Sequence, residues 1–172
     1  MYKFPIGVML ESFHKPAAEA MDAARALGAQ GLQVYATPTV LEQKGITTPS
    51  AQKEFFKMVK DHGLVISALC GDLGHGFGNP DLNPDLVEKS KRILDLAMEF
   101  ETNIVTTHIG VVPSDPSHPR YKIMPVSYTH LDVYKRQLSQ CRRDGGAGRV
   151  PRARRSSLLW GSFLESPDHG ES

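Results

Sequence analysis

The residues best placed to do chemistry are polar side chains at the ends of short apolar segments. His108 directly follows the β-branched residues 104–107, a segment too short for a helix, and Gly110 lies two residues further on. Glu11 ends a second apolar segment, residues 6–10. Catalytic groups cluster at strand ends in α/β barrels. We therefore take His108 as the candidate catalytic residue and expect both side chains to contact substrate. The alternatives are structural: His108 would bond neighbouring backbone, and Glu11 would be paired or solvated.

A glycine-rich loop, GDLGHGFGNP, supplies a third candidate, His75. Such a loop can bring backbone amides close to a phosphate or a sugar, so His75 is a candidate for substrate binding. The glycine spacing is not that of a P-loop or a dinucleotide fingerprint, and glycines also mark simple tight turns. The sequence contains no HExxH, CxxC or GxSxG motif, so zinc-protease, zinc-ribbon and serine-hydrolase activities have no support.

The elements that must position these residues follow a repeating order of strand, loop and helix. The repeat spans about 25 to 40 residues and indicates successive right-handed βαβ units with a parallel sheet. Loops after the strands are longer than the turns before them, which places the working face at the strand C-termini. The pattern predicts strands at 6–10, 32–35, 64–70 and 103–107, and helices at 17–27, 48–62 and 83–101.

Length and composition predict one soluble globular domain. The chain has 172 residues, a 40% hydrophobic content and a net charge of +1. A complete (β/α)8 barrel needs about 250 residues. No segment predicts a membrane span or a signal peptide. Two cysteines far apart in the chain favour a reducing compartment, so we expect a cytoplasmic protein.

Four segments, IGVMLESF, GAQGLQVYATP, VISALCGDLGHGF and VTTHIGVVP, resemble the N-terminal half of the sugar phosphate isomerase/epimerase family. This family belongs to the xylose isomerase-like TIM barrels. The resemblance covers residues 1–124 and implies an α/β fold of the (β/α)8 TIM-barrel type, truncated after about four βα units.

The same resemblance implies a function. Members move a proton between adjacent carbons of a sugar or sugar phosphate through an enediolate, with a divalent ion (Mn, Mg, Co or Zn). Their metal-binding Glu, Asp, His and Glu come mainly from strands 5 to 8, in the half that this chain lacks. His108 is thus a possible metal ligand, and no ligand set is assigned.

Two other functions stay open. An endonuclease IV-like phosphodiesterase would need a histidine-rich three-metal site and a basic DNA-facing surface, whereas residues 1–124 contain 12 Lys or Arg against 14 Asp or Glu. Nucleic acid is therefore not expected as a partner. The chain could also be a non-functional fragment, because half a barrel leaves open edge strands unless it forms a homo-oligomer. We expect activity to be absent or very low.

Residues 125–172 interrupt the pattern. Residues 125–137, PVSYTHLDVYKRQ, resemble the translation of two sequencing-adapter DNA ends, because their reverse translation forms an inverted repeat. A basic block at residues 135–155 follows. A helix beginning near residue 118 is expected to stop at 124, and residues 125–172 are expected to be a non-native, irregular and disordered tail.

Overall fold

One parallel sheet with strand order β1-β2-β3-β4 organises the fold. The computed structural model describes residues 4–144, with side chains as far as residue 138. The strands are β1 (Gly7–Met9), β2 (Gly31–Tyr35), β3 (Val65–Cys70) and β4 (Val105–Thr106). All three strand pairs are parallel. The predicted α/β class and the predicted order of strands are therefore confirmed.

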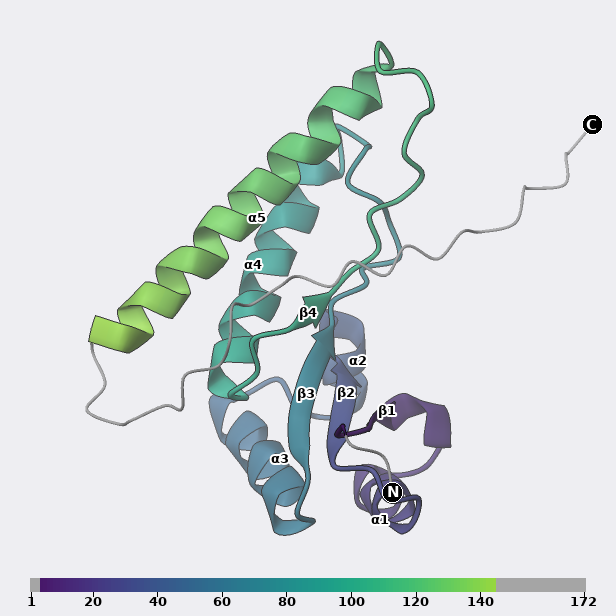
Figure 1. The fold of residues 1–172 in the computed structure, drawn as a ribbon, viewed down its shortest axis with the longest axis vertical. Helices are drawn as coiled ribbons and strands as arrows, with labels where there is room; N and C mark the ends of the chain where they lie inside the picture. The colour runs from purple at the N-terminus through teal and green to yellow at the C-terminus, as the bar shows by residue number, and fades with distance from the viewer. Residues whose placement is uncertain (1–3, 145–172) are drawn as a thin grey trace, which may run out of the picture.

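Helices follow each strand, as successive βαβ units require. They are η1 (Leu10–Phe13, a 3-10 helix), α1 (Ala17–Ala26), α2 (Pro38–Gln43), α3 (Pro49–Asp61), α4 (Asn83–Glu99) and α5 (Pro119–Asp144). α5 runs alongside α4 (Figure 1). The segment predicted as a loop at 36–48 contains α2, and the first strand ends before Glu11, which lies in η1.

The main core lies between the sheet and α1, α3 and α4. Leu32 and Val34 of β2 are buried there against Met21 of α1, Val59 of α3 and other apolar side chains. The opposite face of the sheet is only partly covered, and Val65 of β3 is 60% exposed. Small residues meet on that face, since a Cβ added to Gly7 would lie 2.9 Å from Ser67 Oγ. The sheet is thus buried mainly on the face that packs against the helices.

The expectation that no helix continues past residue 124 is wrong, because α5 extends to Asp144. Its inward side chains recur at helical spacing, and they pack with Phe77, Leu86, Val87 and Leu94 in a second cluster: Tyr128, Leu131, Tyr134 and Leu138. Pro125 removes one backbone bond inside the helix, and this packing compensates. Residues 125–144 are therefore not irregular. The expected disorder of residues 145–172 lies outside the described residues, and the resemblance of residues 125–137 to translated adapter DNA stays a prediction.

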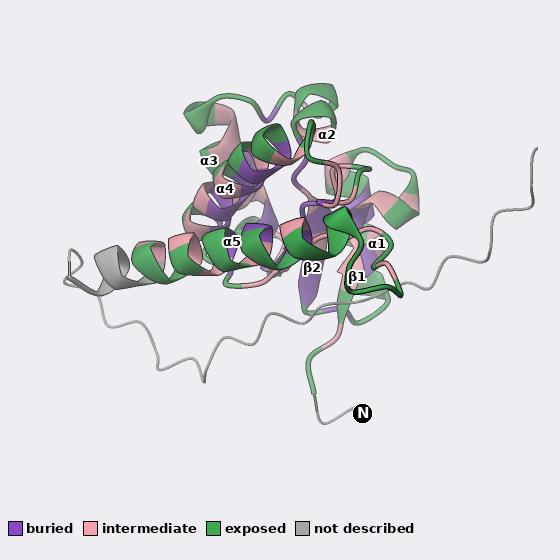
Figure 2. Ribbon diagram, turned by 90° about the horizontal axis from the view of Figure 1, so that it is seen from above, coloured by how far each residue is buried: buried purple, intermediate pink, exposed green. Residues whose placement is uncertain are grey.

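Exposure along α5 is uneven (Figure 2): one side packs against the domain and the other is largely solvent-facing. Among the described residues, no helix combines the length and the hydropathy that a membrane span requires.

Candidate functional site

A cleft of about 700 Å³ opens at the carboxyl ends of the four strands. Every strand, or the loop after it, contributes to its wall. The lining residues are Met9, Gln33, Tyr35, Cys70, Asp72, Gly74, Gly76, Thr106, Thr107 and His108. This is the end of the sheet at which α/β barrels carry their active sites.

A hydrogen-bonded pair forms the floor of the cleft. Gln33 Nε2 on β2 donates to Thr106 Oγ1 on β4 at 2.8 Å, across the intervening strand β3. Thr106 Oγ1 in turn donates to the Leu69 carbonyl at 3.4 Å. These bonds fix the direction of the Gln33 amide, so its carbonyl oxygen can accept a bond from a ligand hydroxyl.

Tyr35, Cys70 and Asp72 form the second polar group in the wall. The Cys70 thiol next to the phenol raises the pKa of Tyr35, with burial and the Asp72 and Glu11 charges adding smaller effects. Tyr35 is therefore a neutral phenol over the physiological pH range. A neutral phenol can donate a hydrogen bond to a carbonyl or hydroxyl oxygen.

Backbone contacts hold His108 at the mouth of the cleft. Thr107 Oγ1 donates to the Gly71 carbonyl at 3.1 Å, and Gly71 N–H donates to the Thr106 carbonyl at 2.7 Å. These contacts tie the start of the glycine-rich loop to the end of β4. The half-buried His108 imidazole lines the cleft that this arrangement encloses.

The glycine-rich loop also packs against the backbone of the residues that follow His108. A Cβ added to Gly76 would lie 2.4 Å from Gly110 Cα, so the two backbones are in contact. Phe77, 1% exposed, anchors the crossing, and its N–H donates to the Ile109 carbonyl at 3.3 Å. Gly76 is therefore explained by close backbone packing, which the glycine pattern alone did not distinguish from phosphate binding.

The two other predicted site residues lie elsewhere. His75 is exposed and borders a separate depression with Asp85 and Lys89. Glu11 Oε1 accepts from Tyr35 N–H at 3.2 Å and pairs with Lys44 Nζ at 2.9 Å. Glu11 thus links η1 to β2 and to the end of α2. This is the paired, structural role that the sequence left open as the alternative to substrate contact. The structure does not bring Glu11 or His75 together with His108.

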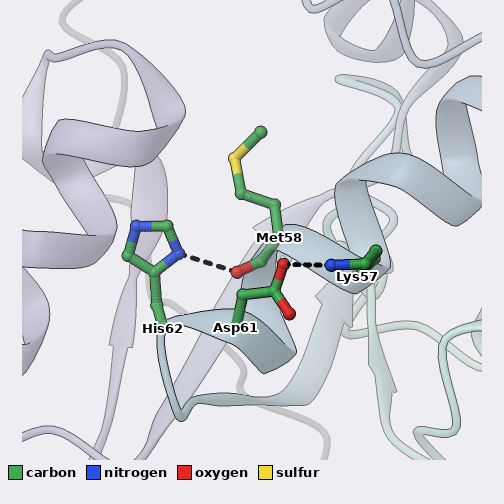
Figure 3. Close-up of polar contacts among 4 residues, drawn as sticks. All are labelled: Lys57, Met58, Asp61 and His62. Atoms are coloured by element: carbon green, nitrogen blue, oxygen red, sulfur yellow. Dashed lines mark hydrogen bonds and ion pairs between the residues drawn. The ribbon is translucent and has the colours of Figure 1, made fainter.

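Another histidine shows what a structural role looks like in this fold. His62 ends α3, and its Nδ1 lies 2.7 Å from the Met58 carbonyl oxygen (Figure 3). Its Nε2 lies 3.6 Å from Asp22 Oδ1 of α1. His62 is therefore half-buried between two helices. In the same figure, Lys57 and Asp61 form an exposed ion pair at 2.6 Å.

The cleft does not contain a complete metal centre within the described part of the chain. Over residues 4–138, no group of three or more His, Cys, Asp and Glu side chains is arranged to hold a metal ion. His108 and Asp72 are the imidazole and the carboxylate in the cleft wall. Two such donors fall short of the four to six or more ligands that protein-bound divalent ions take.

Sequence reasoning missed Gln33, Thr106 and Thr107 as cleft residues. Their signal was present: each is a polar side chain inside or at the end of an otherwise apolar strand. Gln33 and Thr106 alternate with Leu32, Val34 and Val105, which pack in the core, so they point to the other face of the sheet. Thr107 follows β4 and reaches the cleft from the start of the next loop.

Comparison with known proteins places this geometry among the TIM barrels. No protein-family model matches the chain, and no curated protein sequence matches it. Among solved structures, a sugar phosphate isomerase/epimerase from Parabacteroides distasonis superposes with a TM-score of 0.59 at 15% identity, over 93% of this chain and 51% of that one. A xylose isomerase domain protein from Planctomyces limnophilus gives 0.57 at 18%, over 83% and 60%.

A third structure, a xylose isomerase-like TIM barrel protein from Mycobacterium smegmatis in complex with magnesium, gives a TM-score of 0.57 at 18% identity, over 80% of this chain and 54% of that one. The fold is therefore that of part of a TIM barrel. More narrowly, its structural neighbours are xylose isomerase-like and sugar phosphate isomerase/epimerase proteins. The chain spans only 51–60% of the length of these three neighbours.

Proposed function

We propose that this chain forms the N-terminal half of the substrate cleft of a sugar or sugar phosphate isomerase/epimerase. The observation that carries the proposal is the cleft at the strand C-termini, into which β2, β3, β4 and the loops after them direct polar side chains. Gln33, Tyr35 and His108 offer an acceptor, a donor and an imidazole along one wall. A ligand with several hydroxyls and a carbonyl matches such a row of hydrogen-bonding groups.

In this proposal each residue has a positioning role. Gln33 accepts from a sugar hydroxyl while its amide stays bonded to Thr106. Tyr35 donates to a substrate oxygen, and His108 contacts the hydroxyl or carbonyl nearest the cleft mouth. The chemical step needs a base and an acid on either side of the reacting carbons. We assign neither, and we propose that the chain by itself binds a sugar weakly and does not turn it over.

The divalent ion that the family resemblance implies is proposed only for a barrel in which further strands supply carboxylate ligands. The donors described in this cleft are too few, so no step is assigned to a metal. His108 is then either one ligand or a substrate contact.

Ligand-observed NMR on the full 172-residue chain tests the proposal. D-Fructose and D-fructose 6-phosphate serve as probes, compared in the wild type, in His108→Ala and in His130→Ala, a matched change at an exposed position on α5. We expect saturable binding that His108→Ala weakens about tenfold, the loss of one good hydrogen bond, and that His130→Ala leaves unchanged. Absence of saturable binding of either sugar, or equal effects of the two variants, would overturn the proposal.

A further inference from the structure

We propose that two copies of this chain close into one eight-stranded barrel, with β4 of each copy beside β1 of the other. The proposal concerns assembly and does not depend on which ligand the cleft binds. It starts from the two outer strands of the sheet. Among residues 4–144, β1 pairs only with β2, and β4 pairs only with β3. Each outer strand therefore presents unpaired backbone N–H and C=O groups along one edge.

The two open edges are complementary in direction. All strands are parallel, so β1 of a second copy placed next to β4 continues the sheet with the same strand direction and the same inner face. Two copies supply eight strands, the number at which a parallel α/β sheet closes into a TIM barrel. A twofold axis along the barrel makes both junctions equivalent and leaves no free edge.

The inner face of the sheet has the surface that such a closure would cover. Val65, on the central strand β3, is 60% exposed, and β1 lies at the edge with Gly7 exposed. In a closed barrel, side chains from opposite strands fill the interior in layers. The present chain spans only 51–60% of the length of three structural neighbours. A second copy is the occupant that repeats the same geometry.

The outer layer agrees with this arrangement. A right-handed crossover places α5 over the junction between β4 and the next strand, where it would lie beside α1 of the second copy. α5 exposes Val126 and Val133, which are seven residues apart on one side of the helix and are 53% and 48% exposed. α1 exposes Ala18, Ala26 and, at its C-terminal end, Leu27, together with the charged side chains Glu19, Asp22 and Arg25. These surfaces can pack as neighbouring helices do in a barrel.

Closure would also complete the cleft. In one copy the cleft is bounded by four strands and is open toward the missing half of the ring. In the dimer, both copies would direct His108 and Asp72 toward a shared mouth. In the proposed dimer, the second copy would close the open side of the cleft.

Sedimentation equilibrium of the full chain over a range of concentrations tests the proposal. We expect a reversible species of twice the 18.9 kDa chain mass. The double variant V126E/V133E should weaken dimerisation at least about tenfold, because it places charge in an apolar contact. Lys53→Glu on the exposed surface of α3 changes the net charge by the same amount and should have no effect. Circular dichroism verifies that both variants keep their helices.

Hydrogen exchange gives a second measurement that does not depend on a variant. Amides of β1 and β4 should exchange more slowly at high than at low protein concentration, and those of α3 should not change. A monomer at every concentration would overturn the proposal. So would protection of the β1 and β4 amides that does not depend on concentration, since residues 145–172 of the same chain could then account for it. A dimer protected elsewhere, or one insensitive to V126E/V133E, would also overturn it.

Discussion

Substituting alanine for Gly76 tests how the cleft mouth is built. The added Cβ would lie 2.4 Å from Gly110 Cα and 2.8 Å from the Ile109 carbonyl oxygen. Carbon atoms in good contact are separated by about 3.5–4.0 Å, so one of the two crossing backbones must move by about 1 Å or more. The neighbours are backbone atoms and cannot rotate away. Because Gly76 does not have a positive φ, the effect would come from this contact and not from backbone strain.

The expected cost is that of overpacking, about 1–3 kcal/mol in the free energy of unfolding. For a chain of this size that cost lowers Tm by about 2–12 °C. Urea denaturation measures the free energy, and NMR shifts of Thr107 and His108 report movement of the cleft mouth. Gly78→Ala is the matched control, because its Cβ would lie 3.4 Å from the flexible Arg120 side chain. Equal stability of the two variants would refute the close crossing of the two loops.

Three further predictions concern single hydrogen bonds and charges. Thr48→Ala removes the side-chain acceptor that caps α3 and should cost about 0.5–2 kcal/mol, measured by urea denaturation. Ser117→Ala should raise the pKa of Asp115 toward 3.8, because the Ser117 hydroxyl is the main cause of its lowering; NMR titration measures it. The contribution of Asp115 to loop order is therefore present above pH 3.8 and lost as the pH falls through its folded-state pKa. Cys70→Ala should lower the pKa of Tyr35, followed by NMR of its ring.

Each of these has an outcome that would contradict it. Thr47→Ala, one residue before the cap and exposed, is the control for the capping change, and an equal loss in both would exclude capping as the cause. An unchanged Asp115 titration would show that the serine hydroxyl does not hold the carboxylate. An unchanged Tyr35 titration would mean that burial, and not the thiol, sets the phenol's pKa.

The order of elements could be predicted from sequence because each strand is a short apolar run and each of the first helices has an apolar side with a clear start. Pro49 and Pro84 sit in the first turn of α3 and α4, where proline is tolerated. Strands joined by right-handed helical crossovers lie parallel in one sheet, so the order of elements predicts a parallel sheet. The apolar strand segments could not show how much of the inner face of the sheet is exposed, because Val65 lies in an apolar segment just as a buried strand residue would.

The failure at α5 has a specific physical cause. Pro125 and the absence of a long aliphatic run hid a helical period in which Tyr128, Leu131, Tyr134 and Leu138 share one side. The Tyr134 hydroxyl donates to Asp95 Oδ1 of α4 at 2.7 Å, a tertiary contact that no local pattern announces. Tyrosine is a weak predictor of a core position in a sequence, yet here the rings of Tyr128 and Tyr134 pack in the second cluster and the Tyr134 hydroxyl bonds to α4.

The candidate site was predictable in position and less so in composition. His108 was selected because it directly follows a β-branched run, and the structure places it in the cleft wall; its role there stays a prediction. Glu11 met the same criterion, yet the chain turns into η1 at that point and directs the carboxylate to Lys44. A polar residue after an apolar run therefore marks the correct end of the sheet but not which side of the strand it occupies.

That distinction explains why Gln33 is a better guide to function than Glu11. A side chain within a strand has its face set by the alternation of the sheet, and Gln33 must point away from the packed core that holds Leu32 and Val34. Its bond to Thr106 then spans β3 without any backbone contribution. If the inner face of the sheet were packed as an apolar core, a side-chain amide such as that of Gln33 would be unfavourable there. The polar inner face is thus evidence for a solvated, ligand-accessible interior at this end of the sheet, whether a second copy or another segment completes the ring.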